Sequence, residues 1–162
     1  SNSKGHKMGQ RVDVIYTRHL TTDDATAVAK LGYKALHETG LFGVDYDETH
    51  FYTHIKRGLV SPFWQGSLGL MHNEKLIGIA FVHMNQVPWA PKRKVATLQY
   101  FYIEPTYQTN DNMVKLFDNI ETYCREKGIN NLRISNRNID DNSLLNLGFN
   151  IEEKIYTKDY EL

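Results

Sequence analysis

Two neighbouring side chains that can move protons, His37 and Glu38, come at the end of a stretch with helical periodicity. An imidazole titrates near neutral pH, and a carboxylate can orient a water molecule or accept a proton. The pair is therefore a candidate general base for activating a nucleophile. The alternative is a plain helix end, where the histidine interacts with the helix dipole and the glutamate is solvated.

A second chemical feature is the polar segment 108–113, which joins a predicted strand to a predicted helix. The residues before it, 100–103, are aromatic and β-branched as in a strand, and Pro105 ends the ladder. Such a junction directs unpaired backbone N–H groups and the positive end of a helix dipole at the loop, so we expect an anion site there. The helix is predicted from apolar residues at helical spacing, namely Met113, Leu116, Phe117, Ile120 and Cys124.

Three other groups of residues have a structural explanation beside a chemical one. His50 and His54 have the i,i+4 spacing of a zinc site, but no further ligand is near in sequence, so we expect an ordinary helix face and no metal. Cys124 is expected to be a buried packing thiol rather than a nucleophile or half of a disulfide. The basic triplet 92–94 beside Trp89 is either a solvated loop or a contact for an anionic acceptor.

The composition indicates a soluble domain without a dominant charge. The 162 residues are enough for one domain with a proper core. Lysine plus arginine and aspartate plus glutamate both number 19, so no overall field favours nucleic acid or an acidic membrane. No apolar run approaches the roughly 20 residues of a membrane span. We predict a cytoplasmic domain over residues 11–162, with a disordered tail or an expression remnant over residues 1–10.

The apolar pattern predicts elements in the order β, α, α, three β, α, β, α, β. The first helix is expected to begin at Thr22 as N-cap and to fade after Glu38. A hairpin is expected around the turn at 72–75. The other predicted helices cover 47–59, 113–127 and 142–147, and the predicted strands cover 12–16, 67–71, 76–84, 95–103, 131–134 and 149–160.

Several short motifs, in the right order, resemble the Gcn5-related N-acetyltransferase (GNAT) family. They are Leu76-Ile77-Gly78-Ile79-Ala80, Tyr102-Ile103-Glu104-Pro105-Thr106-Tyr107-Gln108, Leu145-Asn146-Leu147-Gly148-Phe149 and Leu36-His37-Glu38-Thr39. The last of these resembles a stretch of a subgroup of the family that is common in phages and bacteria. The resemblance implies an α/β (α+β) fold with a mixed, mostly antiparallel central sheet flanked by helices.

The resemblance also implies acetyl-CoA as co-substrate and an amine as acceptor. By this likeness, Phe101 and Ile103 face the pantetheine arm, and Gln99 lies where many members place a glutamate that activates the amine through water. His37 and Glu38 fall on the acceptor side, together with Phe42 and the Trp89 loop. The resemblance also implies that the pyrophosphate binds to the segment between the strand and the helix, which consists of Gln108, Thr109, Asn110, Asp111, Asn112 and Met113.

Three residues depart from the family pattern. Asp111 stands at a glycine of the loop, Met113 at a small residue, and Leu144 at the tyrosine that protonates the departing thiolate. The predicted function is an acyl-CoA-dependent N-acyltransferase acting on a small molecule, a protein or a modified nucleotide, with a homodimer as one possible assembly. The alternative is a catalytically inactive member of the fold that acts as a binding module.

Overall fold

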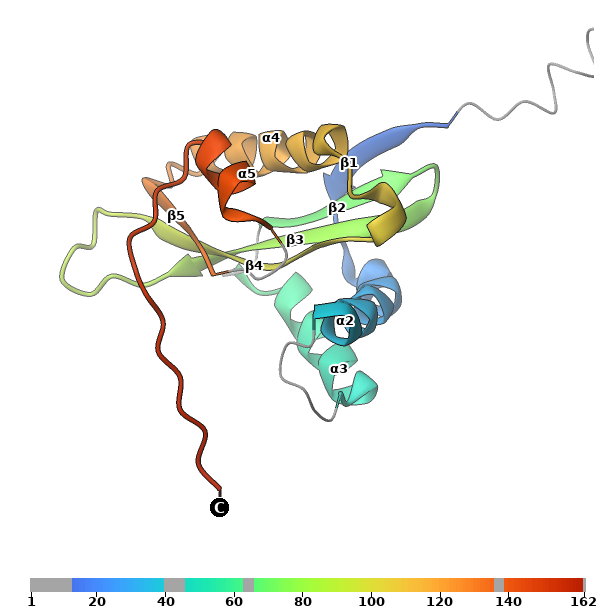
Figure 1. The fold of residues 1–162 in the computed structure, drawn as a ribbon, viewed down its shortest axis with the longest axis horizontal. Helices are drawn as coiled ribbons and strands as arrows, with labels where there is room; N and C mark the ends of the chain where they lie inside the picture. Colours follow the sequence, from blue (N-terminus) through green and yellow to red (C-terminus); the bar gives the residue numbers. More distant parts are fainter. Residues whose placement is uncertain (1–12, 40–45, 63–65, 136–138, 162) are drawn as a thin grey trace, which may run out of the picture.

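The computed structural model describes residues 13–39, 46–62, 66–135 and 139–161 (Figure 1). Within these ranges one sheet contains β1 (Ile15–His19), β2 (Gly66–His72), β3 (Lys75–Asn85), β4 (Val95–Ile103) and β5 (Asn131–Ile134). The helices are α2 (Ala25–Thr39), α3 (Glu48–Leu59), α4 (Asn110–Glu126) and α5 (Asp141–Asn146), with 3-10 turns η1 (Thr22–Asp24) and η3 (Pro105–Tyr107). None of the helices in these ranges is long and apolar enough to cross a membrane.

The strands lie in the sheet in their order along the chain. The pairs β1–β2, β2–β3 and β3–β4 are antiparallel, and β4–β5 is parallel. The last pair is parallel because α4 carries the chain back across the sheet between the two strands. The predicted mixed, mostly antiparallel sheet with flanking helices is confirmed.

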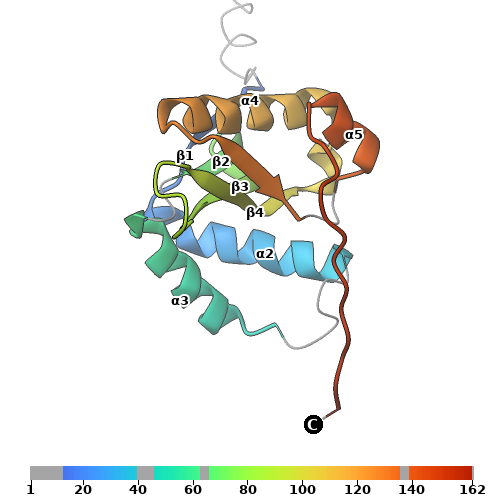
Figure 2. The ribbon, with the colours of Figure 1, turned by 90° about the vertical axis from the view of Figure 1, so that its left-hand side faces the viewer.

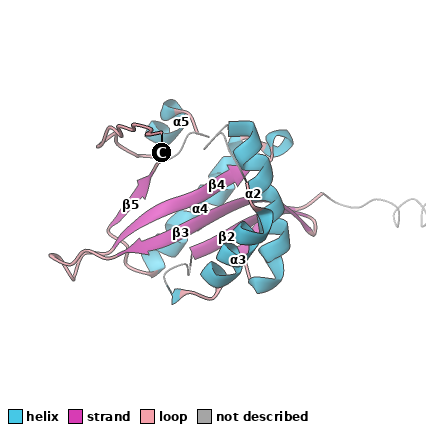
Figure 3. Ribbon diagram, turned by 90° about the horizontal axis from the view of Figure 1, so that it is seen from below, coloured by secondary structure: helices cyan, strands magenta, loops and turns pink. Residues whose placement is uncertain are grey.

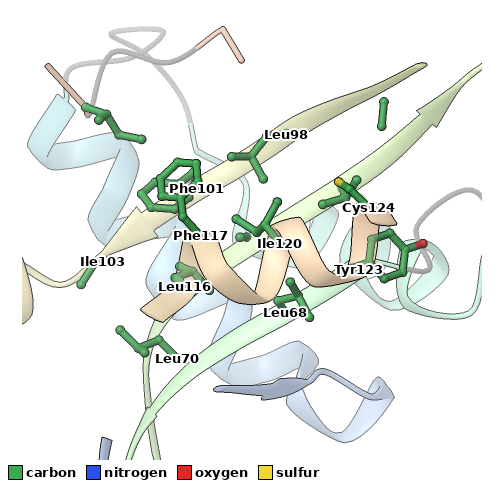
Figure 4. Close-up of a cluster of buried hydrophobic side chains, with 14 of the residues drawn as sticks. Leu68, Leu70, Leu98, Phe101, Ile103, Leu116, Phe117, Ile120, Tyr123 and Cys124 are labelled. Atoms are coloured by element: carbon green, nitrogen blue, oxygen red, sulfur yellow. The ribbon is translucent and has the colours of Figure 1, made fainter. Parts of the chain in front are cut away.

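Helices cover both faces of the sheet, with α4 on one side and α2 and α3 on the other (Figures 1 and 2). Successive strand side chains point to opposite faces, so β4 contributes to two cores. Phe101 and Ile103 pack beneath α4, where the rings of Phe101 and Phe117 lie 5.0 Å apart (Figure 4). Tyr102 joins the other core, which α2 and α3 cover with Val28, Leu31 and Ile55.

Most predicted elements are present, with shifted ends. The hairpin turns at Asn73, whose φ of 53° is left-handed, a conformation that asparagine tolerates better than most residues. The first strand begins at Ile15 rather than at residue 12. The predicted N-cap Thr22 is wrong: Thr21 caps the segment in a capping box with Asp24, because its own backbone is extended. The helix after the polar loop begins at Asn110, three residues earlier than predicted.

The predicted last strand over 149–160 is wrong. Residues 149–161 form no strand, and the chain leaves the domain as an extended segment (Figure 1). Ile151 and Ile155 are 72% and 69% exposed, so their strand-like alternation has no sheet surface to cover. A strand needs a neighbour for its backbone hydrogen bonds, and no described strand pairs with this segment.

Candidate functional site

Among the described residues, β4 has a neighbour on its β5 side along only half of its length. β5 pairs with residues Val95 to Leu98 and ends at Ile134, and we call this side of the rest of β4 the opening between β4 and β5 (Figure 3). On the other side Glu104 donates its backbone N–H to Ile77 of β3 at 2.8 Å. Because hydrogen-bonding direction alternates along an antiparallel strand, the N–H of Ile103 points away from β3, into the opening between β4 and β5.

A bulge interrupts β4 just before this opening. Ile79 pairs with Tyr102 and Phe81 pairs with Gln99, so Tyr100 and Phe101 together oppose the single residue Ala80. Tyr100 has a φ of 52°, in the left-handed region that a tyrosine rarely adopts. Such a conformation costs about 1–2 kcal/mol and persists only where the surrounding structure imposes it. The bulge turns this part of the strand just where β5 leaves it.

The backbone of the predicted phosphate-binding segment is only partly available. The N–H groups of Gln108, Thr109 and Met113 bond to backbone carbonyls at 3.2, 2.8 and 3.0 Å, and that of Asn112 donates to the Thr109 hydroxyl at 3.2 Å. Asn110 and Asp111 are the first two residues of α4, and helix geometry offers their N–H groups no acceptor within the helix. These two amides, at the positive end of the helix dipole, are the ones that can bind an anion.

Two side chains of the same segment brace the turn from within. Gln108 donates from Nε2 to the carbonyl of Ile103 at 2.7 Å, which closes the end of β4. Asn112 is buried and donates from Nδ2 to the carbonyl of Tyr107 at 2.8 Å. Asp111 is exposed in the first turn of α4, and Met113 packs against the core. The segment therefore offers its backbone, not its side chains, to a ligand.

The end of α2 is tied to the end of β4 by a row of polar contacts. Tyr102 donates its hydroxyl proton to Glu38 at 2.5 Å. One turn earlier on α2, Lys34 approaches the buried carboxylate of Glu104 at 3.0 Å, and Lys75 of β3 lies 3.6 Å from its other oxygen. Lys34 and Glu38 are four apart and so share a face of α2, and Tyr102 and Glu104 are two apart and so share a face of the strand. The two polar contacts therefore form side by side. Glu38 is thereby brought against the central strand.

The other predicted acceptor-side residues are less closely engaged. His37 is exposed, and its ring meets that of Tyr33 edge-on at 4.2 Å. Gln99 is half-buried in β4, beside the bulge. Trp89 is 86% exposed on the loop between β3 and β4. Phe42 lies outside the described residues.

A group of rings beside β4 was not predicted from the sequence as a site. We call it the ring cluster, and each ring in it contacts another: Tyr33, His37, Tyr46, Phe51, His54 and Tyr100. Its centre is Phe51, 5.6 Å from Tyr46 and 5.7 Å from Tyr100 between ring centroids. His54 Nε2 lies 3.2 Å from the Tyr100 hydroxyl. The three-residue spacing of Phe51 and His54 is visible in the sequence, but their contact with a strand 46 residues later is not.

The cavity outside β5 does not coincide with the expected cofactor position. It has a volume of about 470 Å³ and lies between β5, α5 and the first part of the C-terminal segment. Of β4 it touches only Thr97, and none of the residues 101–113 lines it. The unpaired C-terminal segment forms one of its walls, so we take the opening between β4 and β5, rather than this cavity, as the candidate site.

The remaining candidates take structural places. Cys124 is buried, and burial raises the pKa of its thiol to about 11, which confirms a packing thiol. Leu144 is half-buried against the core that α4 covers. Over the described parts of the chain, no three histidine, cysteine, aspartate or glutamate side chains gather in a way that could hold a metal ion. His54, half of the i,i+4 histidine pair, contacts Tyr100.

No protein-family model and no curated protein sequence matches the chain. Solved structures do. A protein of Clostridium acetobutylicum described as a predicted acetyltransferase, with acetyl-CoA, is 12% identical with a TM-score of 0.75, over 90% of this chain and 96% of that one. An aminoglycoside N-acetyltransferase in complex with CoA is 15% identical with a TM-score of 0.73, over 94% and 98% of the two chains.

A GCN5-related N-acetyltransferase from Ralstonia eutropha is similar to the same degree. It is 13% identical with a TM-score of 0.72, over 90% of this chain and 99% of that one. The similarity extends over nearly the whole of each chain. The chain therefore has the fold of the Gcn5-related N-acetyltransferases.

Proposed function

We propose that the protein is an N-acyltransferase that moves an acetyl group from acetyl-CoA to a primary amine. The observation that carries this proposal is that, among the described residues, β5 pairs with β4 only as far as Leu98, and that β4 then leads, through η3, to the N-terminus of α4. A pantetheine arm can lie along the part of β4 beyond Leu98, at Phe101 and Ile103. The pyrophosphate can bind the N–H groups of Asn110 and Asp111. Two structural neighbours contain acetyl-CoA or CoA, which supports this assignment.

The proposed reaction asks little of the side chains. The amine nitrogen attacks the thioester carbonyl carbon, a C–N bond forms and the C–S bond breaks. CoA leaves as a thiolate that takes up a proton, and the nitrogen loses one. A backbone N–H that points into the opening, such as that of Ile103, can polarise the carbonyl oxygen. Since attack needs mainly a deprotonated amine in the right place, the loss of a tyrosine acid at Leu144 slows this chemistry without abolishing it.

The acceptor side is proposed to lie on the other face of β4, where α2 ends. There His37, Glu38 and Gln99 serve to orient the amine and its water. The acceptor can be a small molecule, a protein or a modified nucleotide, and the aminoglycoside N-acetyltransferase among the neighbours favours a small molecule.

We also propose a homodimer, because the exposed Ile151 and Ile155 leave apolar surface that a second copy can cover. Sedimentation at micromolar concentrations tests this proposal.

One backbone amide provides a sharp test of acetyl-CoA binding. In Asn110→Pro, the N–H at the first position of α4 is removed, yet proline is well tolerated at this position of a helix. The preceding residue, Thr109, already has the extended backbone that a following proline requires, with ψ at 158°. We expect calorimetry to show acetyl-CoA binding to the unchanged protein. The variant should bind about tenfold more weakly, the effect of one hydrogen bond to a charged group.

The matched control is Asp141→Pro, which makes the same change at the first position of α5. Asp140 before it is also extended, with ψ at 153°, and none of the proposed cofactor residues lies on α5. This control should leave acetyl-CoA affinity unchanged, and both variants should keep the melting temperature. Absence of any binding at millimolar acetyl-CoA, or equal affinities for the two variants, would overturn the proposed site.

An inactive binding module is the second candidate, favoured by Asp111 and Leu144 at positions where the family has a glycine and a tyrosine. Binding of acetyl-CoA without release of CoA, in a screen of amines, peptides and nucleotides, would support it. Consumption of acetyl-CoA that depends on an added amine supports the enzyme instead.

A further inference from the structure

The ring cluster combines exposed aromatic surface with one polar end, and the proposed reaction has not yet used it. Tyr33 and Tyr100 are 46% and 40% exposed, while Tyr46 and Phe51 between them are half-buried. Tyr46 is held in place by a hydrogen bond from its hydroxyl to the carbonyl of Ala29 at 2.7 Å. The rings meet edge-on or tilted, an arrangement that fixes their positions relative to one another.

The polar end of the cluster lies at the bulge of β4. Tyr100 is the residue with the left-handed backbone, and its ring is held between Phe51, His54 and Phe81 by edge-on contacts of 5.7, 6.3 and 5.7 Å. Its hydroxyl reaches His54 Nε2 at 3.2 Å. A strained backbone conformation thus places a tyrosine hydroxyl and an imidazole together beside the part of β4 that follows Leu98.

We propose that the ring cluster binds the acceptor as a primary amine carried on an aromatic or other flat apolar body, and that the Tyr100–His54 pair takes the proton from its nitrogen. This proposal rests on the proposed acetyl transfer. As the nitrogen gives up its proton to the Tyr100 oxygen, the hydroxyl passes its own proton to His54 Nε2, and the neutral amine then attacks the thioester. The imidazolium returns its proton to solvent, and the thiolate takes one up.

The ionisation of the pair fits this order of events. Burial lowers the pKa of His54, and nearby His50 lowers it further, so the imidazole is neutral and can accept a proton. Burial raises the pKa of Tyr100, so its hydroxyl stays protonated and can donate. Among the proposed acceptor-side residues, Glu38 already accepts the proton of Tyr102, and His37 contacts Tyr33 at the exposed end of α2. His54 is the imidazole with a hydrogen bond to β4.

The charges around the cluster favour a single amine over a polycation. The two helices that carry most of its rings contain Lys30, Lys34, Lys56 and Arg57 against Glu38 and Glu48, with Asp47 as the N-cap of α3 and Glu104 paired with Lys34. A polyamine or aminosugar with several ammonium groups would find no excess of carboxylates among these residues to pair with. One ammonium over an aromatic face gains a cation–π contact, and the flat body attached to it covers the remaining rings.

The test uses 2-phenylethylamine as acceptor, with ethanolamine as the same amine without a ring and kanamycin as a polycation. We expect acetylation of 2-phenylethylamine with kcat/KM at least tenfold above either comparison amine. Tyr100→Phe keeps the ring and should lower kcat about 100-fold with little change in KM, as expected for a lost proton acceptor. Phe51→Leu should instead raise KM about tenfold. Tyr16→Phe, the same change at an exposed tyrosine of β1 outside the ring cluster, is the control and should match the unchanged protein.

The outcomes separate this inference from the proposed function. Acetyl-CoA affinity, measured by calorimetry, should be the same in all three variants, because none of them replaces a residue of the segment 101–113. Failure of the unchanged protein to bind acetyl-CoA overturns the proposed function itself. Turnover of ethanolamine but not of 2-phenylethylamine, a preference for kanamycin, or equal kcat for Tyr100→Phe and Tyr16→Phe overturns the inference alone.

Discussion

The hydroxyl of Tyr102 on β4 donates its proton to the carboxylate of Glu38 on α2 across 2.5 Å. Burial, and then this hydrogen bond, raises the pKa of Tyr102, so the tyrosine stays protonated and is the donor near neutral pH. The contact holds the proposed acceptor-side carboxylate against the strand that the thioester would follow. It also places α2 relative to β4, together with the Lys34–Glu104 ion pair.

Replacing Glu38 by Gln tests its proposed role in orienting the acceptor amine. The amide keeps the size and can still accept from Tyr102, but the charge is lost. We expect turnover to fall about tenfold, acetyl-CoA affinity to stay unchanged, and the free energy of unfolding to fall by about 1 kcal/mol. Glu126→Gln, an exposed acid at the end of α4, is the control. Equal rates for the two variants would return Glu38 to the alternative of a solvated helix end.

Removing the charge of Asp111 should tighten acetyl-CoA binding. Asp111→Asn relieves repulsion from the pyrophosphate by about 1 kcal/mol, or about fivefold in affinity. The same carboxylate favours the N-terminus of α4, so the variant should lose about 0.5 kcal/mol of stability. Asp118→Asn, an exposed acid further along α4, should change neither affinity nor its salt dependence. Weaker binding in Asp111→Asn would show that the carboxylate takes part in binding.

A carboxylate at the start of the first helix should make the free energy of unfolding depend on pH in the acid range. Asp24 accepts from Arg18 at 2.7 and 2.8 Å and from the Thr21 backbone at 2.8 Å. The Arg18 hydrogen bonds, aided by those from Thr21, hold the pKa of Asp24 below its unfolded value of 3.8. The unfolded chain therefore binds the proton more readily, and the stabilisation is present above about pH 4 and is lost as the pH falls through the folded pKa.

Urea unfolding measures this effect. At pH 7 we expect Asp24→Asn to lower the free energy of unfolding by about 1 kcal/mol, as for loss of a capping group. At pH 3 the difference from the unchanged protein should shrink. Asp23→Asn, with an exposed carboxylate next to it, is the control. A difference that is the same at both pH values would contradict the assignment of the effect to the ionised pair.

Local signals in the sequence were sufficient for much of the framework. The apolar spacing from Met113 to Cys124 predicts α4, and its burial confirms the face. The turn at Asn73 and the strand before Pro105 follow from residue preferences that act within a few positions. An anion site at 108–113 is predicted for the same reason, because a strand that enters a helix leaves backbone donors unpaired whatever the side chains are.

Within that segment the structure reduced six residues to two available amides, because hydrogen bonds to Pro105, Tyr107 and Thr109 occupy the rest. At the C-terminus the sequence predicted an element that the protein does not form. Alternating apolar residues predicted a strand over 149–160, but a strand depends on a neighbour that the alternation itself cannot provide.

Tertiary structure alone decided which side chains meet. Glu38 reaches Tyr102 over 64 positions, and His54 reaches Tyr100 over 46. The bulge at Tyr100 depends on the register of β4 against β3. One extra residue in β4 shifts this register, and the residue pattern of β4 alone does not indicate where. Helical and strand periodicities report the face of one element at a time. The contacts that make the candidate acceptor site join faces of three elements, and only the packing of α2 and α3 on the sheet brings them together.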